Sequence, residues 1–205
     1  MRIVWIASVV LWLGVVASGL AMVAAYDNRP GVSAEAPASW PETSRLARTA
    51  DRPTLVMVVH PRCDCSRASI AELAELMARA TVRPHAYVAI LRPNGLSEDW
   101  DVTGIRQAAM RIPGVKVIRD EAGREARSFG AQTSGQTFLY DGGGRLLFSG
   151  GITAARGHAG ESVGRTAILS LLNHTPTSAP TSSVFGCSLS SPADQRWTET
   201  DADNR

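Results

Sequence analysis

The 205-residue chain has little net charge and few cysteines. Its 21 basic and 19 acidic residues give a formal net charge of +2, and Lys116 is the only lysine. A basic excess this small, spread along the chain, supplies no electrostatic footprint for nucleic acid, so no nucleic-acid partner is expected. The three cysteines, Cys63, Cys65 and Cys187, exclude two structural disulfides and leave one thiol over. The length allows one domain of ordinary size plus appendages.

One long apolar run lies at the N-terminus. Residues 3–26 carry no charged side chain, and a helix of that length covers a hydrocarbon core of about 30 Å. Arg2 precedes the run while Asp27 and Arg29 follow it, a weak bias that favours a cytoplasmic N-terminus. A cleaved signal peptide is the alternative, because residues 23–25 (Val-Ala-Ala) are small where a signal peptidase would cut. Either way the rest is exported. An uncleaved helix predicts a single-pass protein of the inner (cytoplasmic) membrane, with its domain facing the periplasm or cell exterior.

Composition divides the remaining chain into three parts. Residues 27–42 are rich in Pro, Ala and other small residues, which suits a linker that keeps the domain clear of the bilayer. Residues 43–174 carry the periodic segments of a folded domain. Residues 175–205 form a Pro/Ser/Thr-rich tail, whose polar end we expect to be disordered.

An apolar island, Val184-Phe185-Gly186-Cys187, interrupts this polar tail. Docking of Val184 and Phe185 on the domain would explain these apolar residues, and it would bring Cys187 to Cys63 and Cys65. The alternative is an isolated cluster with an incidental thiol.

The domain alternates strand and helix patterns. A continuous β-prone run at 54–59 indicates a strand buried on both faces, and one apolar helical face follows from Ser66 to Met77. The further predicted elements are a short helix at 42–47, a strand at 86–91, a helix at 97–112 with a weak point at Gly104, a strand at 115–118, a helix at 121–129, a hairpin of 137–140 and 146–149, and a helix around 163–172. This order predicts an α/β fold, a mixed sheet with helices on both faces.

Cys63 and Cys65 lie at the first strand-to-helix junction. A cysteine there faces unpaired backbone N–H groups and the positive end of the helix dipole, which favour thiolate over thiol. Arg62 adds a positive charge. We therefore expect Cys63 to be the more acidic and more reactive thiol, and Cys65 to be more shielded, one step into the first turn. His60 either assists the sulfur chemistry or faces water at the strand end.

The motifs HPRCDCS (60–66), GQTFLYD (135–141), GGITAARGH (150–158) and VFGCS (184–188) carry a resemblance. With the element order, the chain resembles the thioredoxin-like superfamily over roughly residues 43–173, and within it the membrane-anchored exported thiol-redox proteins called RedB-like. The resemblance implies a thioredoxin-like fold, a protein thiol or disulfide client and no cofactor. It also implies that Cys63 is the nucleophile and that Ser66 stands where the family has its second cysteine.

Two departures from the family pattern matter. The site reads C-x-C-S instead of C-x-x-C, so the usual resolving cysteine is missing from its place and Cys187 becomes a candidate for that role. A disulfide between Cys63 and Cys65 would be strained and therefore labile. The family's cis-proline is also absent, because Ser134-Gly135-Gln136 occupies its stretch, which makes Gly135 a candidate supporting residue beside His60, Arg62 and Ser66.

Three functions stay open at this point. Thiol-disulfide redox chemistry, with the chain as a possible thiol-disulfide oxidoreductase, uses Cys63, Cys65 and Cys187. Metal binding or delivery is the second, because His60 and three thiolates form a soft donor set suited to copper as Cu(I) or to zinc. A non-catalytic binding module on the thioredoxin fold is the third.

Overall fold

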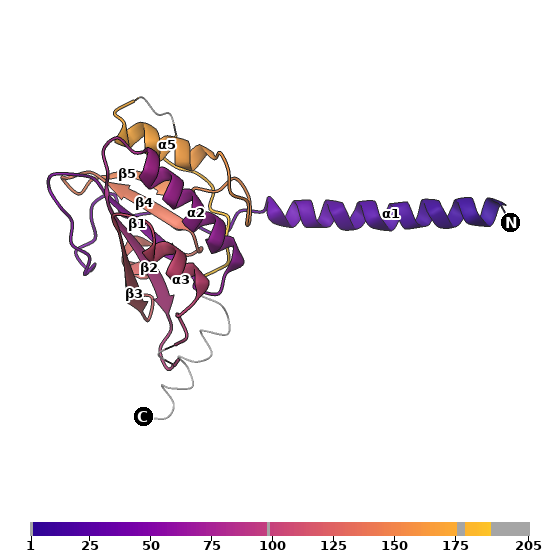
Figure 1. Cartoon of the computed structure of the whole chain (residues 1–205), viewed down its shortest axis with the longest axis horizontal. Coiled ribbons are helices and arrows are strands. Elements are labelled where there is room, and N and C mark those ends of the chain that lie inside the picture. Colours follow the sequence, from indigo (N-terminus) through magenta and orange to yellow (C-terminus); the bar gives the residue numbers. More distant parts are fainter. Residues whose placement is uncertain (1, 98, 176–178, 190–205) are drawn as a thin grey trace.

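A five-stranded sheet forms the centre of the domain (Figure 1). The computed structural model describes residues 2–97, 99–175 and 179–189. The strands are β1 (Thr54–Val59), β2 (His85–Arg92), β3 (Val115–Glu121), β4 (Gln136–Tyr140) and β5 (Leu146–Gly150), in the order β3-β2-β1-β4-β5. β1, β2 and β3 are parallel, whereas β4 is antiparallel to β1 and β5 is antiparallel to β4. β1 is buried along its whole length, as its continuous apolar run predicts.

Helices cover both faces of the sheet. α2 (Asp64–Arg79), α3 (Gly104–Met110) and α5 (Val163–Leu172) contribute Leu73, Ile105 and Ile168 to the core on one face. α4 (Arg124–Phe129) packs Phe129 against Phe138 in the core on the other face. Three parallel strands followed by an antiparallel hairpin and a last helix make a thioredoxin-like mixed sheet, so the predicted fold class is confirmed.

α1 (Arg2–Asp27) extends away from the domain (Figure 1). Its side chains are exposed from Ile3 to Tyr26. By length and composition it could cross a membrane, and its place near the N-terminus is equally typical of a signal sequence. The predicted N-terminal apolar helix is therefore present.

The short helix predicted at 42–47 is wrong. Glu42 and Thr43 lie in a turn, and the next residues have no helical backbone. The local polar groups bond elsewhere, because the Ser44 hydroxyl and the Arg45 amide both donate to the Glu125 carboxylate, at 2.6 and 3.0 Å. Tertiary bonds to α4 thus replace the helical ladder here.

The helix predicted at 97–112 is shorter than expected. Within the described part of 97–103 the chain forms turns, and α3 begins only at Gly104. Thr103 is the N-cap, and its side chain accepts a hydrogen bond from the Arg106 amide. Asp101 is fully buried and pairs with Arg106 and Arg119, at 3.0 Å each, which fixes the preceding turn outside the helix.

The predicted linker, residues 27–42, does not stand free of the domain. The Gly31 amide donates to the Val184 carbonyl, and the Thr133 hydroxyl donates to the Val32 carbonyl. Farther on, the Trp40 ring packs edge-on against Phe129 and Tyr140. Proline and alanine in this stretch reflect an extended segment bonded along the domain surface instead of a flexible tether.

The described part of the tail, 179–189, also packs on the domain. The Ser149 amide donates to the Pro180 carbonyl beside β5, and Ser182 Oγ donates to the Gly151 carbonyl at 2.6 Å. The expected disorder of the polar end concerns residues 190–205, which lie outside the described residues. The docking of the apolar island is considered with the site.

A buried ion pair fixes α2 against α5. Arg165 of α5 donates to the Glu72 carboxylate of α2 at 2.5 Å, and both side chains are more than nine-tenths buried. The Gly160 amide donates to the second Glu72 oxygen at 2.6 Å. If Glu72 alone were removed, the positive charge of Arg165 would stay buried without its carboxylate partner.

We therefore expect Glu72→Ala to lower the free energy of unfolding by about 3 kcal/mol in urea denaturation. Glu75→Ala is the matched control on the same helix, since Glu75 pairs with Arg79 where both side chains are about half exposed. Its effect should stay within about 0.5 kcal/mol. Equal losses of unfolding free energy for the two variants would show that the buried pair stabilises the fold no more than the exposed pair does.

Candidate functional site

Cys63 occupies the junction between β1 and α2. It is the N-cap residue of α2, with extended backbone angles, and its side chain is only 2% exposed. The turn that leads to it closes when the Cys63 amide donates to the His60 carbonyl at 3.2 Å. The Ser66 amide then donates to the Cys63 carbonyl at 2.9 Å and starts the helix. The thiol thus lies among the unpaired donors of the first helical turn.

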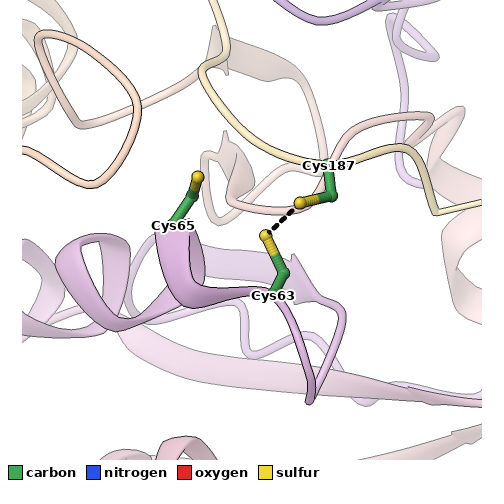
Figure 2. Close-up of side chains that lie close together, drawn as sticks. All are labelled: Cys63, Cys65 and Cys187. Carbon is green, nitrogen blue, oxygen red and sulfur yellow. Dashed lines mark hydrogen bonds between the residues drawn. The ribbon is translucent and has the colours of Figure 1, made fainter. Parts of the chain in front are cut away.

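The tail brings Cys187 to this thiol. The two sulfur atoms, Cys63 Sγ and Cys187 Sγ, lie 2.8 Å apart (Figure 2). Val184 and Leu189, which are 1% and 6% exposed, anchor the segment on either side of Cys187. Between these anchors the Ser134 amide donates to the Cys187 carbonyl at 2.8 Å. The island therefore docks, and docking places the third cysteine at the site.

Gly186 allows the close approach of the tail. A side chain at this position would collide with the carbonyl group of Ser134. The tail backbone thus reaches the loop before β4 only because residue 186 has no Cβ.

Cys65 completes a group of three thiols. It lies in the first turn of α2, and its sulfur stands to one side of the Cys63–Cys187 pair (Figure 2). All three sulfur atoms lie within 4.8 Å of one another. Residues 63 and 187, which are 124 positions apart in the sequence, therefore meet in one cluster.

The cluster separates the acidities of its thiols. Burial opposes ionisation of Cys63, but hydrogen bonds from the side chain and amide of Cys187 and from Ser66 outweigh it and lower the pKa of the Cys63 thiol. Burial and the charge of Cys63 raise the pKa of the Cys65 thiol. Burial, followed by the hydrogen bond donated to Cys63, raises the pKa of Cys187 to about 12. Cys63 is therefore the first of the three to ionise.

Two details of the sequence interpretation change. Cys63, not Cys65, is the more shielded thiol, because the loop before β4 and the tail cover it whereas Cys65 is partly exposed. The Arg62 guanidinium lies over the Trp100 ring, 5.2 Å from the ring centroid, and the groups that lower the pKa of Cys63 are Cys187 and Ser66. The acidity of Cys63 comes from hydrogen-bond donors.

A chain of hydroxyl groups supports the nucleophile position. The His60 amide donates to Ser134 Oγ at 2.8 Å, and Ser134 Oγ lies 2.6 Å from Ser66 Oγ. Ser66 is fully buried and is one of the donors that stabilise the Cys63 thiolate. Ser66, three residues after Cys63, thus acts on this thiol through a hydrogen bond.

Gly135 directly precedes β4, in the stretch Ser134-Gly135-Gln136, which contains no proline. Its amide donates to the Val58 carbonyl at 2.8 Å, and its φ of +90° lies in the region that favours glycine. A side chain there would clash with Ser69 of α2. Gly135 therefore lets the loop before β4 press against the helix that carries the cysteines.

Sequence reasoning missed Arg156 and Ser134. Arg156 lies in the motif GGITAARGH, whose last residue, His158, is exposed and has a ring nitrogen 2.7 Å from the Arg156 carbonyl oxygen. The Arg156 guanidinium donates to the Gly186 carbonyl, one residue before Cys187, and its charge lowers the pKa of Cys65 and Cys187 against the larger effects that raise them. An arginine in a Gly-rich loop was the sequence feature that could have indicated Arg156 as a site residue.

The three thiols fit a soft metal ion. Thiolate ligands select Cu(I) and also bind Zn²⁺, and three sulfurs within 4.8 Å can share one ion. His60 does not belong to this group: its Nδ1 accepts a hydrogen bond from the Arg62 amide at 3.2 Å, and its ring packs on Trp100. The donor set among the described residues is thus three sulfurs, without the imidazole expected from the sequence.

Solved structures share the fold. A hypothetical protein of Sinorhizobium meliloti 1021 matches at a TM-score of 0.59 and 18% identity, over 77% of this chain and 96% of its own. An uncharacterized conserved protein of Geobacillus kaustophilus matches at 0.56 and 15% identity, over 81% of this chain and 95% of its own. At these identities the likeness is one of fold alone. No protein-family model and no curated protein matches the chain.

In a Cys65→Ser background, we expect the first thiol to ionise below the free-cysteine value of about 8.5, and Cys63→Ser should abolish that step. Ser66→Ala should move the step upwards, because the thiolate loses a donor. Thiolate absorbance in a pH titration measures it. Ser69→Ala, a change at a buried serine under Gly135, is the control and should leave the step in place. An unshifted step in Ser66→Ala would contradict the role of this donor.

Proposed function

We propose that this chain is an exported, membrane-anchored thiol-disulfide oxidoreductase in which Cys63 is the nucleophile and Cys187 the resolving thiol. The observation that carries the proposal is the 2.8 Å approach of the two sulfur atoms at the N-terminus of α2. A buried thiol with a lowered pKa next to a second thiol with a raised pKa matches the division of labour between attacking and resolving cysteines. The resemblance to RedB-like proteins agrees with this chemistry.

In the reducing direction, the Cys63 thiolate attacks one sulfur of a client disulfide. A Cys63–client disulfide forms, the client S–S bond breaks, and one client thiolate leaves with the electron pair. Cys187 then loses its proton to that thiolate and attacks Cys63 Sγ, which releases the second client thiolate and leaves a Cys63–Cys187 disulfide. Two electrons pass from the chain to the client. The reverse sequence oxidises a client dithiol.

In the proposed mechanism, the high pKa of Cys187 changes before the second step. Part of that rise comes from the hydrogen bond to Cys63 and from the Cys63 charge. Both causes vanish when Cys63 is held in the mixed disulfide, whereas the positive charge of Arg156 remains and favours the Cys187 thiolate. Burial, the largest cause of the rise, remains, so the pKa of the resolving thiol is lowered in part after the first step.

A second candidate function is binding or delivery of a soft metal ion. The observation that favours it is the convergence of three sulfurs within 4.8 Å, one more than a dithiol exchange requires. The two functions differ in what they ask of Cys65, because exchange needs only Cys63 and Cys187 while a three-sulfur site needs all three.

The redox proposal predicts a Cys63–Cys187 disulfide in the oxidised full-length protein, found as a single joined pair of peptides after digestion. Cys65→Ser is the matched control and should keep the disulfide. In Cys187→Ser the mixed disulfide with a client should accumulate, at least tenfold over the parent chain, because the resolving step is lost. Mass spectrometry of protein trapped in cells with acid measures both.

A Cys187 that stays freely alkylated in the oxidised protein would contradict the redox proposal. If reduced protein instead retains one Cu(I) or Zn²⁺ that shields all three thiols, and Cys65→Ser loses it, the metal function replaces it.

The localisation proposal predicts that residues 1–26 remain attached and that the domain faces the periplasm. A membrane-impermeant maleimide should label the thiols in intact spheroplasts, and the mass of the membrane-bound protein should include α1. The motivation is the length and apolar surface of this helix. Labelling only after lysis would contradict the orientation, and a chain beginning near residue 26 would show cleavage.

A further inference from the structure

Arg156 joins the Cys187 segment to the chain that leaves α1. Its guanidinium donates through one terminal nitrogen to the Gly186 carbonyl, and through Nε to the Arg29 carbonyl at 3.2 Å. Its backbone amide donates to the Asp27 carbonyl at 3.0 Å. The same guanidinium lies over the Tyr26 ring, 5.0 Å from the ring centroid. One side chain thus bonds both a carbonyl next to the resolving cysteine and a carbonyl just after the apolar helix.

The contact with Arg156 adds to the attachment of the Cys187 segment. Its anchors Val184 and Leu189 fix the two ends of the segment, but Cys187 itself is exposed, and besides its bonds to Cys63 it accepts a hydrogen bond from the Ser134 amide. A planar guanidinium can donate to two carbonyls at once, whereas a lysine ammonium is a point donor on a flexible stem. The bond to Gly186 therefore restricts the backbone directly before the thiol.

We infer that Arg156 is a positioning residue that holds Cys187 at Cys63 and links this contact to the segment directly after α1. The inference rests on the proposed redox function of the Cys63–Cys187 pair. Arg156 sets the effective concentration of the Cys187 thiol at Cys63, which fixes how readily the intramolecular disulfide forms. Through Tyr26 and Arg29, the position of the helix end contributes to the same equilibrium.

The test uses the full-length protein in detergent micelles, equilibrated in glutathione buffers of graded redox ratio, with the Cys63–Cys187 disulfide quantified by mass spectrometry. In Arg156→Gln the equilibrium constant for the disulfide should fall about tenfold, equivalent to about 30 mV for a two-electron couple. Arg156→Lys keeps the charge but not the two-carbonyl geometry, and should recover less than half of the loss on a logarithmic scale. Tyr26→Ala should lower the constant about threefold.

Arg67→Gln is the matched control, because this arginine is exposed on the first turns of α2, where it pairs at 3.6 Å with Asp64, which is exposed as well. It should leave the equilibrium unchanged. A thermal unfolding midpoint within a few degrees of the parent for every variant separates positioning from general loss of structure.

The outcomes distinguish the two proposals. If the parent chain forms no Cys63–Cys187 disulfide at any glutathione ratio, the redox function fails. If the parent forms it and Arg156→Gln forms it equally well, only the role of Arg156 fails. Full recovery in Arg156→Lys would show a purely electrostatic effect and overturn positioning, and an unchanged Tyr26→Ala would overturn the link to α1.

Discussion

A buried thiolate is tolerated only where enough hydrogen-bond donors face it, and this constraint governs the site. Cys63 is almost fully covered, and burial by itself would keep it protonated. Donors from Ser66 and from the side chain and amide of Cys187 reverse that effect. Two of these donors belong to the tail. The chemistry of the first cysteine therefore depends on the docking of a segment more than one hundred residues away in sequence.

That docking in turn depends on the segments around it. Residues 132–134 bond the tail on one side, through Ser134 and Gln132, and the extended segment after α1 on the other, through Thr133. The N-terminal segment and the tail also bond each other directly, from the Gly31 amide to the Val184 carbonyl. The segment after α1, the loop before β4 and the tail thus form one hydrogen-bonded network that includes Cys187.

The third thiol allows two kinds of chemistry at the site, disulfide exchange and three-sulfur metal binding, whereas a dithiol offers only two sulfur ligands. Cys65 shares the first helical turn with Cys63 and lies within reach of both other sulfurs. A disulfide between Cys63 and Cys187 consumes two of the three soft donors, so disulfide formation and three-sulfur metal binding exclude each other. Any metal bound there would be released on oxidation.

The sequence by itself determined the fold class and the position of the first two cysteines. The apolar run at 54–59, the helix after it with one apolar face, and the hairpin of 137–140 and 146–149 are local patterns that match the elements found. The tertiary structure decided the rest. Residues 42–47 form no helix because Ser44 and Arg45 bond Glu125, and the expected linker is bonded to the domain. The partners in both cases lie far along the chain, so local sequence does not reveal them. The source of Cys63 acidity, the exclusion of His60 and the place of Arg156 likewise depend on contacts between distant segments, which no local period encodes.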